Sequence, residues 1–268
     1  MKYSRILAAL LGLFLLAGCS IVPFQTPEEQ RAAQATAQAL RAEAQAEADP
    51  FAALTGEFSL SRTLVNEQGV ELASYNVSFP RFSENGQKSK TFERINNYYE
   101  NELSGLVQDA YSFFNVVKQS YGEEWNSVLA ADKVYSVDIT HTLLEAPAGY
   151  LTVRCDFRVE ENGQVETYSQ AQVFLLDNGW HLTMETLLGE HYDTTAPKLT
   201  ANILAWCKNN GITVTNANLR TLEEFSGNFA LTKEGFLFYT EPFQLNNKNA
   251  NRYSIPVSRS GFRSVLED

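Results

Sequence analysis

Histidine is the side chain best suited to acid–base and metal chemistry near neutral pH, and this 268-residue chain has only three. His191 lies among carboxylates in Glu190-His191-Tyr192-Asp193, and His181 forms a second, looser pair with Glu185. Neither pair has the spacing of a metal motif such as HExxH, and no GxSxG, P-loop or GxGxxG is present. His141 lies on the apolar side of a predicted strand, where we expect a core histidine rather than a ligand. We therefore expect no metal, no cofactor and no catalytic site.

The N-terminus carries the most informative short motif. Lys2 and Arg5 precede an apolar run from Ile6 to Leu16, and Leu16-Ala17-Gly18-Cys19 follows. This pattern is typical of a lipoprotein signal peptide, and the run is shorter than the roughly 20 residues of a transmembrane helix; a buried N-terminal helix is the alternative. We expect cleavage after Gly18 and diacylation of Cys19. The protein would then be extracytoplasmic and anchored in the cell membrane, or in the outer membrane of a diderm.

Two further cysteines lie in apolar segments. Cys155 belongs to a predicted strand, and Cys207 shares one face of a predicted helix with Leu199, Ile203 and Trp206. Outside the cytoplasm they could form a disulfide, but pairing needs Cα atoms within about 7 Å. We favour two separate buried thiols.

The charge balance excludes one class of partner. Lys and Arg total 21 and Asp and Glu total 32, which gives a net charge of −11. Removal of Lys2 and Arg5 with the signal peptide changes it to −13. Nucleic-acid binding needs concentrated Lys and Arg, so we expect none.

Composition divides the chain into four parts. We expect a signal peptide over 1–18, an Ala/Gln/Glu-rich stalk over 19–52, an N-terminal domain over 53–178 and a C-terminal domain over 179–268. The stalk has strong helix formers but no apolar stripe, which indicates a solvated spacer; a coiled coil is the alternative, but no a/d heptad is present.

Apolar periodicity predicts the secondary structure of both domains. A period of two predicts strands, and Asn162-Gly163 and Asn178-Gly179 have the residues of type I′ hairpin turns. Spacings of three and four predict helices. The predicted elements are a hairpin over 57–79, a long helix over 92–117, strands over 135–143, 151–159 and 165–176, a helix over 198–208, and strands over 228–231, 236–243 and 253–257. The fold class is therefore α+β, with antiparallel sheets each packed against a helix in two closely associated units.

Three stretches resemble a known family. The run from Phe229 to Tyr239, with Glu241-Pro242-Phe243 and Ser254-Ile255-Pro256-Val257, is similar to the C-terminal pattern of RsiV-like sensor domains of anti-sigma factors. Residues 176–188 resemble a segment of the same domains. The run from Tyr75 to Phe82, followed by Ile95-Asn96, resembles the accessory domain that precedes the sensor, which also occurs in PdaC-type peptidoglycan deacetylases. The resemblance covers most of 54–266.

The resemblance implies a binding module, for which lysozyme is the ligand in RsiV itself. Departures from the family are a lipoprotein signal in place of a sigma-binding segment and transmembrane helix, no deacetylase domain, and Glu145-Ala146-Pro147-Ala148-Gly149 in place of a Gly-Gly-Ala-His run. The candidate binding residues are Tyr239, Glu241, Phe243, Asn246 and Asn247. Tyr239 and Phe243 have core packing as their alternative role, and Asn246-Asn247 has a turn.

Three functional hypotheses follow. The first is a non-catalytic, lipid-anchored envelope protein that binds lysozyme, peptidoglycan or another envelope protein, and a strongly acidic chain attracts a cationic protein such as lysozyme. The second is a cell-wall glycan hydrolase that uses carboxylates and His191. The third is a structural or assembly lipoprotein with the stalk as spacer.

Overall fold

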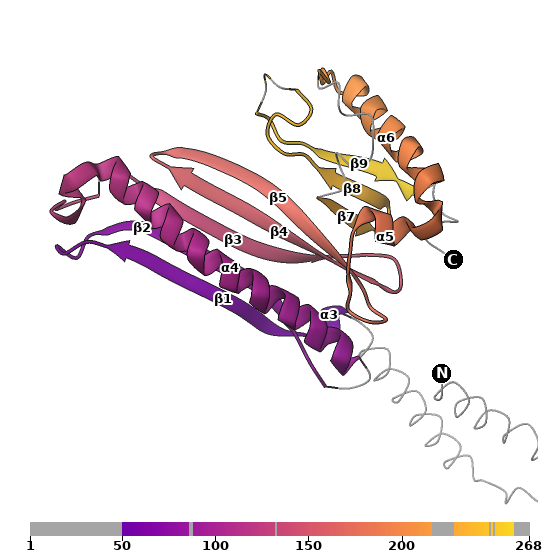
Figure 1. The fold of residues 1–268 in the computed structure, drawn as a ribbon, viewed down its shortest axis with the longest axis horizontal. Coiled ribbons are helices and arrows are strands. Elements are labelled where there is room, and N and C mark those ends of the chain that lie inside the picture. Colours follow the sequence, from indigo (N-terminus) through magenta and orange to yellow (C-terminus); the bar gives the residue numbers. More distant parts are fainter. Residues whose placement is uncertain are drawn as a thin grey trace, which may run out of the picture. The chain divides into compact units, whose positions relative to one another are not determined.

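The computed structural model contains a six-stranded sheet and a three-stranded sheet (Figure 1). The structure describes residues 50–85, 88–131, 133–215, 228–246, 248 and 250–259. Their contacts belong to one unit, Glu47–Asp268. Cys19 and the stalk up to residue 49 lie outside the described residues. None of the described helices combines the length and the apolar content that crossing a membrane requires.

The larger sheet has its strands in chain order. They are β1 (Leu54–Val65), β2 (Glu71–Phe82), β3 (Tyr135–Leu144), β4 (Tyr150–Glu161), β5 (Gln164–Leu175) and β6 (His181–Leu182). Neighbours pair antiparallel except β2 and β3, which are parallel. The prediction of antiparallel sheets is therefore wrong at this junction. The reason is the connection, because α4 (Ser89–Tyr121) crosses between the two strands as parallel pairing requires.

The two Asn-Gly dipeptides behave differently. Asn162 and Gly163 have φ of 50° and 81°, so the β4–β5 hairpin has the predicted pair of positive φ angles. At Asn178-Gly179 only the glycine has positive φ, 74°, and its N–H donates to the carbonyl oxygen of Leu175 at 2.7 Å. This second turn is therefore wider than the predicted type I′ turn, although β5 and β6 do pair antiparallel.

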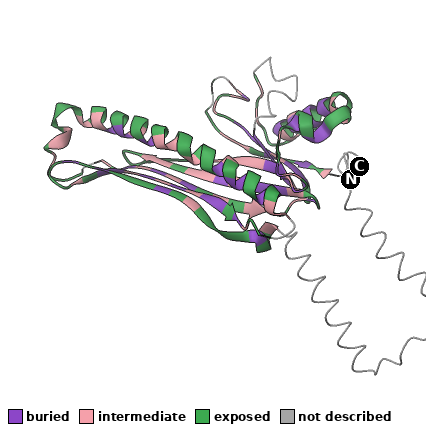
Figure 2. Cartoon of the chain, turned by 60° about the horizontal axis from the view of Figure 1, so that its bottom comes forward, coloured by how far each residue is buried: buried purple, intermediate pink, exposed green. Residues whose placement is uncertain are grey.

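Helix α4 covers one face of the larger sheet (Figure 1), and Figure 2 shows its buried and exposed sides. The apolar stripe predicted from spacings of three and four is partly buried. Its buried members are Phe92, Ile95, Tyr99, Ala110 and Val117, and its half-buried members are Leu103, Leu106 and Phe113. Asn96 fixes the helix to β2. Its side chain accepts a hydrogen bond from the N–H of Phe82 and donates to the carbonyl oxygen of Phe82, both at 2.9 Å. The short α3 (Pro50–Ala53) directly precedes β1, and the 3₁₀ helix η1 (Gly122–Asn126) directly follows α4.

The second sheet contains β7 (Phe229–Thr232), β8 (Gly235–Tyr239) and β9 (Ser254–Ser258), all antiparallel. The helices α5 (Met184–Leu188) and α6 (Tyr192–Asn209), joined by the 3₁₀ helix η2 (Gly189–His191), share a separate hydrophobic cluster with it. Helix α6 begins six residues before the predicted start at 198, with Pro197 in its second turn. Because Pro197 has no N–H, the carbonyl oxygen of Asp193 lacks its usual helix donor at this position. The α+β class is confirmed.

The second sheet packs on the end of the first through polar contacts as well as apolar ones. Thr152 of β4 donates a hydrogen bond to the carbonyl oxygen of Leu231 at 2.7 Å. Asn228 bridges to the edge of β5, where its Oδ1 accepts from the N–H of Ala171 at 3.0 Å and its Nδ2 donates to the carbonyl oxygen of Ser169 at 3.2 Å. One asparagine side chain thus replaces a strand partner over these two residues.

The two cysteines lie in different hydrophobic clusters. Cys155 of β4 is buried under α4, and Cys207 lies on the buried face of α6. Both are free thiols, which confirms the prediction of separate cysteines. Burial raises the pKa of the Cys155 thiol to about 12, so it is neutral and unreactive in the folded protein.

Candidate binding cleft

The candidate residues predicted from sequence do not form one surface. Tyr239 is buried, with 5% of its surface exposed, whereas Phe243 is 53% exposed and adopts a φ of 62°. Glu241 is exposed in the turn that follows β8. Asn246 is half-buried and donates to the carbonyl oxygen of Thr213 at 3.2 Å. Asn247 lies outside the described residues.

Tyr239 and Asn246 line different pockets. Asn246 lies in a pocket of about 500 Å³ next to the C-terminal end of α6, which also contains Trp206 and Ile212. Tyr239 lies in a cleft of about 550 Å³ between the two sheets. Tyr253 contributes to both. We take the larger cleft as the candidate site because its polar side chains converge from several strands.

The floor of the cleft is the face of the larger sheet that points away from α4. Along β4 the side chains alternate, so that Val153 and Cys155 are buried under α4 while Asp156 and Arg158 point the other way. The side chains on this floor come from β3, β4 and β5. They are Asp138, Thr140, Asp156, Arg158, Thr167 and Ser169.

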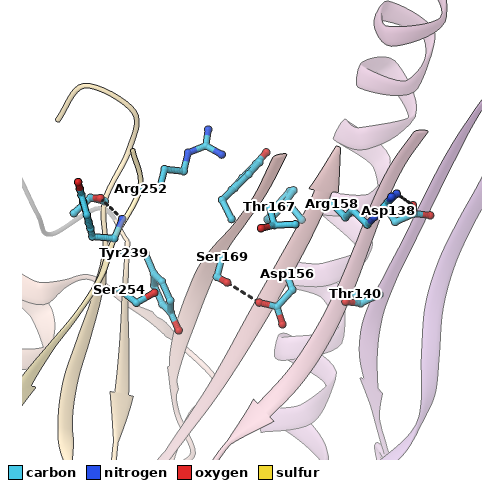
Figure 3. A pocket seen from close by; sticks show the side chains of 13 residues that line it. Asp138, Thr140, Asp156, Arg158, Thr167, Ser169, Tyr239, Arg252 and Ser254 are labelled. Carbon is cyan, nitrogen blue, oxygen red and sulfur yellow. Dashed lines mark hydrogen bonds and ion pairs between the residues drawn. The ribbon is translucent and has the colours of Figure 1, made fainter. Parts of the chain in front are cut away.

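The strand register arranges these six side chains in two rows. Thr140 is paired with Asp156, which is paired with Ser169, and these three form the first row. Asp138, Arg158 and Thr167 form the second row in the same way. Neighbours within a row are about 4.8 Å apart and the rows are separated by two residues, roughly 6.7 Å along the strand. Figure 3 shows these side chains standing on the three strands.

The opposite wall comes from the end of β8 and the start of β9, and consists of Tyr239, Thr240, Arg252, Tyr253 and Ser254. In Figure 3, Tyr239, Arg252 and Ser254 lie across the cleft from the floor. This wall is tied together because the hydroxyl of Thr240 accepts from the N–H of Tyr253 at 2.7 Å. Its position relative to the floor depends on Asn228, whose bond to Ser169 reaches a residue of the floor itself.

The cleft lining includes three stacked groups. The rings of Phe157 and Tyr168 are 4.5 Å apart and nearly parallel. The guanidinium of Arg252 lies 3.8 Å above the Tyr168 ring, and its Nη1 is 2.9 Å from a carboxylate oxygen of Glu166. Because both faces of Tyr168 are covered, this ring offers its edge rather than a stacking face to a ligand.

Every charged group that lines the cleft has an opposite charge as partner. Asp156 is 2.9 Å from Arg154 and accepts from the hydroxyl of Ser169 at 2.6 Å. Asp138 accepts from the amide of Asn76 at 3.0 Å and is 3.8 Å from Arg158. Arg252 is paired with Glu166, as described above. The lining therefore holds two carboxylates and two guanidinium groups, with no net charge.

Tyr239 lines the cleft although it is almost fully buried. Burial raises the pKa of Tyr239 to about 12, and the positive charge of Arg154 partly opposes this shift. The hydroxyl is therefore neutral at physiological pH and can act only as a hydrogen-bond donor or acceptor.

The histidine sites considered from sequence lie elsewhere. His191 and Glu190 are 3.9 Å apart, and neither lines the cleft. His141 is half-buried, with its Nδ1 3.0 Å from the hydroxyl of Ser78, and His181 stacks on Tyr98. Among the described residues no group of three or more His, Cys, Asp and Glu could hold a metal ion.

Sequence reasoning missed the floor of the cleft. The signal was present in the polar members of the alternating strands, such as Arg154, Asp156 and Arg158 between the buried residues of β4. The alternation within one strand shows which residues are polar but not which residues of the neighbouring strands lie beside them. The rows of the floor depend on the register of the β3–β4 and β4–β5 pairs.

Comparison with solved structures identifies similar folds. A DUF3298 family member from Bacteroides fragilis has a TM-score of 0.50 and 14% identity, and the match covers 79% of this chain and 92% of that chain. A DUF3298 family protein from Pseudomonas aeruginosa has a TM-score of 0.41 and 11% identity, over 78% and 92% of the two chains. No family model matches the sequence, and no curated protein matches it. The structural neighbours of this chain are thus DUF3298 family proteins, and the likeness to the first shows the fold alone.

Proposed function

We propose that this chain is a lipid-anchored binding protein of the cell envelope that holds its ligand in the cleft between the two sheets. The observation that supports binding most directly is the cleft itself. It has the volume of a small-molecule or peptide-end site, and its polar side chains point inward from five strands. The resemblance of residues 1–19 to a lipoprotein signal peptide ending at Cys19 supports a location outside the cytoplasm.

The arrangement of the charges favours binding over catalysis. A general acid or base needs a side chain that is free to exchange a proton with the substrate. Asp138 and Asp156 instead accept hydrogen bonds from Asn76 and Ser169 and lie beside arginines. Groups held in this way keep a fixed geometry, which lowers the entropy cost of recognising a ligand.

The resemblance to RsiV-like domains supports lysozyme or peptidoglycan as the ligand class. Titration calorimetry of the unlipidated chain from residue 20 onward, with lysozyme and with purified cell walls, tests the proposal at low and at physiological salt. We expect saturable binding to one of them that persists at physiological salt. Cytochrome c is the control, because it is also small and cationic but unrelated to the cell wall.

Two results would contradict the proposal. Lysozyme binding that disappears at physiological salt and is matched by cytochrome c would reflect only opposite net charges. Absence of binding to both lysozyme and cell walls at low salt would remove the binding role. The anchor has a separate test, intact-mass analysis of protein extracted from membranes, and an unmodified Cys19 would refute the proposed localisation.

A cell-wall hydrolase is the second candidate, because Asp138 and Asp156 are carboxylates on neighbouring strands of one cleft. Glycosidases use such a pair, one of them protonated. Release of reducing ends from cell walls that is abolished by Asp156→Asn would support a hydrolase. Binding to cell walls without release of reducing ends would exclude it.

A further inference from the structure

We infer that the cleft between the two sheets takes an uncharged, hydroxyl-rich saccharide, an assignment that rests on the proposed binding function and specifies its ligand. The argument comes from the chemistry of the lining. Beside the internally paired charges, the cleft is lined by hydroxyl side chains from both walls. They are Thr140, Thr167, Tyr168, Ser169, Tyr239, Thr240, Tyr253 and Ser254.

The charge balance of the lining disfavours a strongly charged ligand. The two lining carboxylates and two lining guanidinium groups each have a partner of opposite charge within the protein. These pairs are partly exposed and individually weak, but together they leave the lining without a net charge that would attract an anion or a cation. A neutral ligand can hydrogen-bond to the paired groups without separating them.

The unused hydrogen-bonding capacity suits hydroxyl groups of a ligand. Thr140 and Thr167 make no side-chain hydrogen bond with any described residue, although both lie on the floor. A hydroxyl donates one bond and accepts two, so these side chains can serve both roles toward the hydroxyls of a sugar. Asp156 and Arg158 lie between them in the two rows and add an acceptor and a donor.

The floor is rigid enough to recognise a fixed pattern. The second row continues across the sheet, where Ser61 donates to Asn76 at 2.8 Å and Asn76 donates to Asp138 at 3.0 Å. This chain of hydrogen bonds holds Asp138 in place from the side away from the cleft. The result is a grid of donors and acceptors with a spacing of about 5 to 7 Å, on the scale of one sugar ring and its substituents.

The test uses a variant in which only the unused hydroxyls are removed. Thr140→Val/Thr167→Val keeps the side-chain shape at two exposed positions, so the fold is retained. The matched control is Thr142→Val, because Thr142 lies on the same strand and face, two residues beyond Thr140, and outside the cleft. Titration calorimetry measures binding of three uncharged saccharides, an N-acetylglucosamine trimer, cellotriose and maltotriose, to the unlipidated chain and both variants.

We expect at least one of these saccharides to bind, with an affinity that changes little between low and physiological salt. The double variant should bind it at least fivefold more weakly, since each lost hydrogen bond costs about that factor, and Thr142→Val should bind as the native protein does. The inference is overturned if none of the three binds at millimolar concentration, if salt weakens binding strongly, or if the double variant binds normally. Binding of whole cell walls or lysozyme without saccharide binding would overturn this inference and leave the proposed function standing.

Discussion

Asn228 should control both the stability of the sheet junction and the width of the cleft. Its side chain is 9% exposed and forms two hydrogen bonds with the backbone of β5, to Ala171 at 3.0 Å and to Ser169 at 3.2 Å. The change Asn228→Ala removes both hydrogen bonds and leaves the N–H of Ala171 and the carbonyl oxygen of Ser169 without a partner at a half-buried strand edge. Each orphaned group costs about 1 to 3 kcal/mol, so we expect a loss of roughly 2 to 4 kcal/mol once partial access of water is allowed for.

Urea unfolding followed by circular dichroism measures this loss. With a denaturant dependence of about 2 kcal/mol per molar urea, the midpoint should fall by roughly 1 to 2 M. Asn202→Ala is the control, because Asn202 is exposed on α6 and donates only to the helix carbonyl of Lys198. Its midpoint should shift by a small fraction of that amount.

The same variant has a functional consequence. Since Asn228 ties the second sheet to Ser169 on the cleft floor, its loss should weaken ligand binding even under conditions where the protein is fully folded. The reasoning would be refuted by an unchanged urea midpoint for Asn228→Ala. It would also be refuted by an equal loss of stability in Asn202→Ala, because the hydrogen bonds to β5 would then not be the cause.

Three other experiments test the packing around the two sheets. Asn96→Ala should cost about 2 to 4 kcal/mol in urea unfolding because it orphans an N–H and a C=O at the end of β2, whereas Asn97→Ala, at an exposed neighbouring position, should be nearly neutral. Gly235→Ala should cost roughly 3 kcal/mol or abolish folding, because φ is 144° and the new Cβ would lie 2.2 Å from a carbonyl oxygen of β9; Gly56→Ala, with open space around it, is the comparison. Cys155 should resist iodoacetamide at about pH 8 until urea unfolds the protein, as peptide mass analysis can show. Alkylation of the native thiol at about pH 8 would contradict its burial. Burial raises the pKa of this thiol from 9.0 to about 12, so the stability that depends on the neutral thiol is complete below pH 9 and is lost as the pH rises through about 12.

Local patterns in the sequence predicted most of the elements, because each pattern has a local physical cause. The three- and four-residue spacing of Phe92, Ile95 and Tyr99 reflects one buried helix face, and all three are buried in α4. Asn162-Gly163 favours positive φ at both positions and forms the β4–β5 turn. Element boundaries were less accurate, as α6 shows, since its first turns are stabilised by packing and not by an apolar stripe of their own.

The pairing of β2 with β3 could not be derived in the same way. Alternating apolar residues show that a strand has a buried face. They do not show which strand is its neighbour or in which direction that neighbour runs. The crossover through α4 allows parallel pairing, whereas a hairpin would have required antiparallel pairing. Unless this pairing is known, the hydrogen bond between Asn76 and Asp138 cannot be predicted from the sequence, because the two residues are 62 positions apart.

The same limit explains why Tyr239 was the one predicted binding residue that lies in the larger cleft. It was chosen from a motif near the C-terminus, and the motif encodes the β8–β9 pairing that places one wall of the cleft. The facing side chains come from strands some 70 to 100 residues earlier, and they reach the cleft only because Asn228 and Thr152 dock the second sheet on β4 and β5. A binding site built across two sheets therefore depends on tertiary contacts that no single motif contains, and those docking contacts are the part of this molecule in which stability and ligand binding should change together.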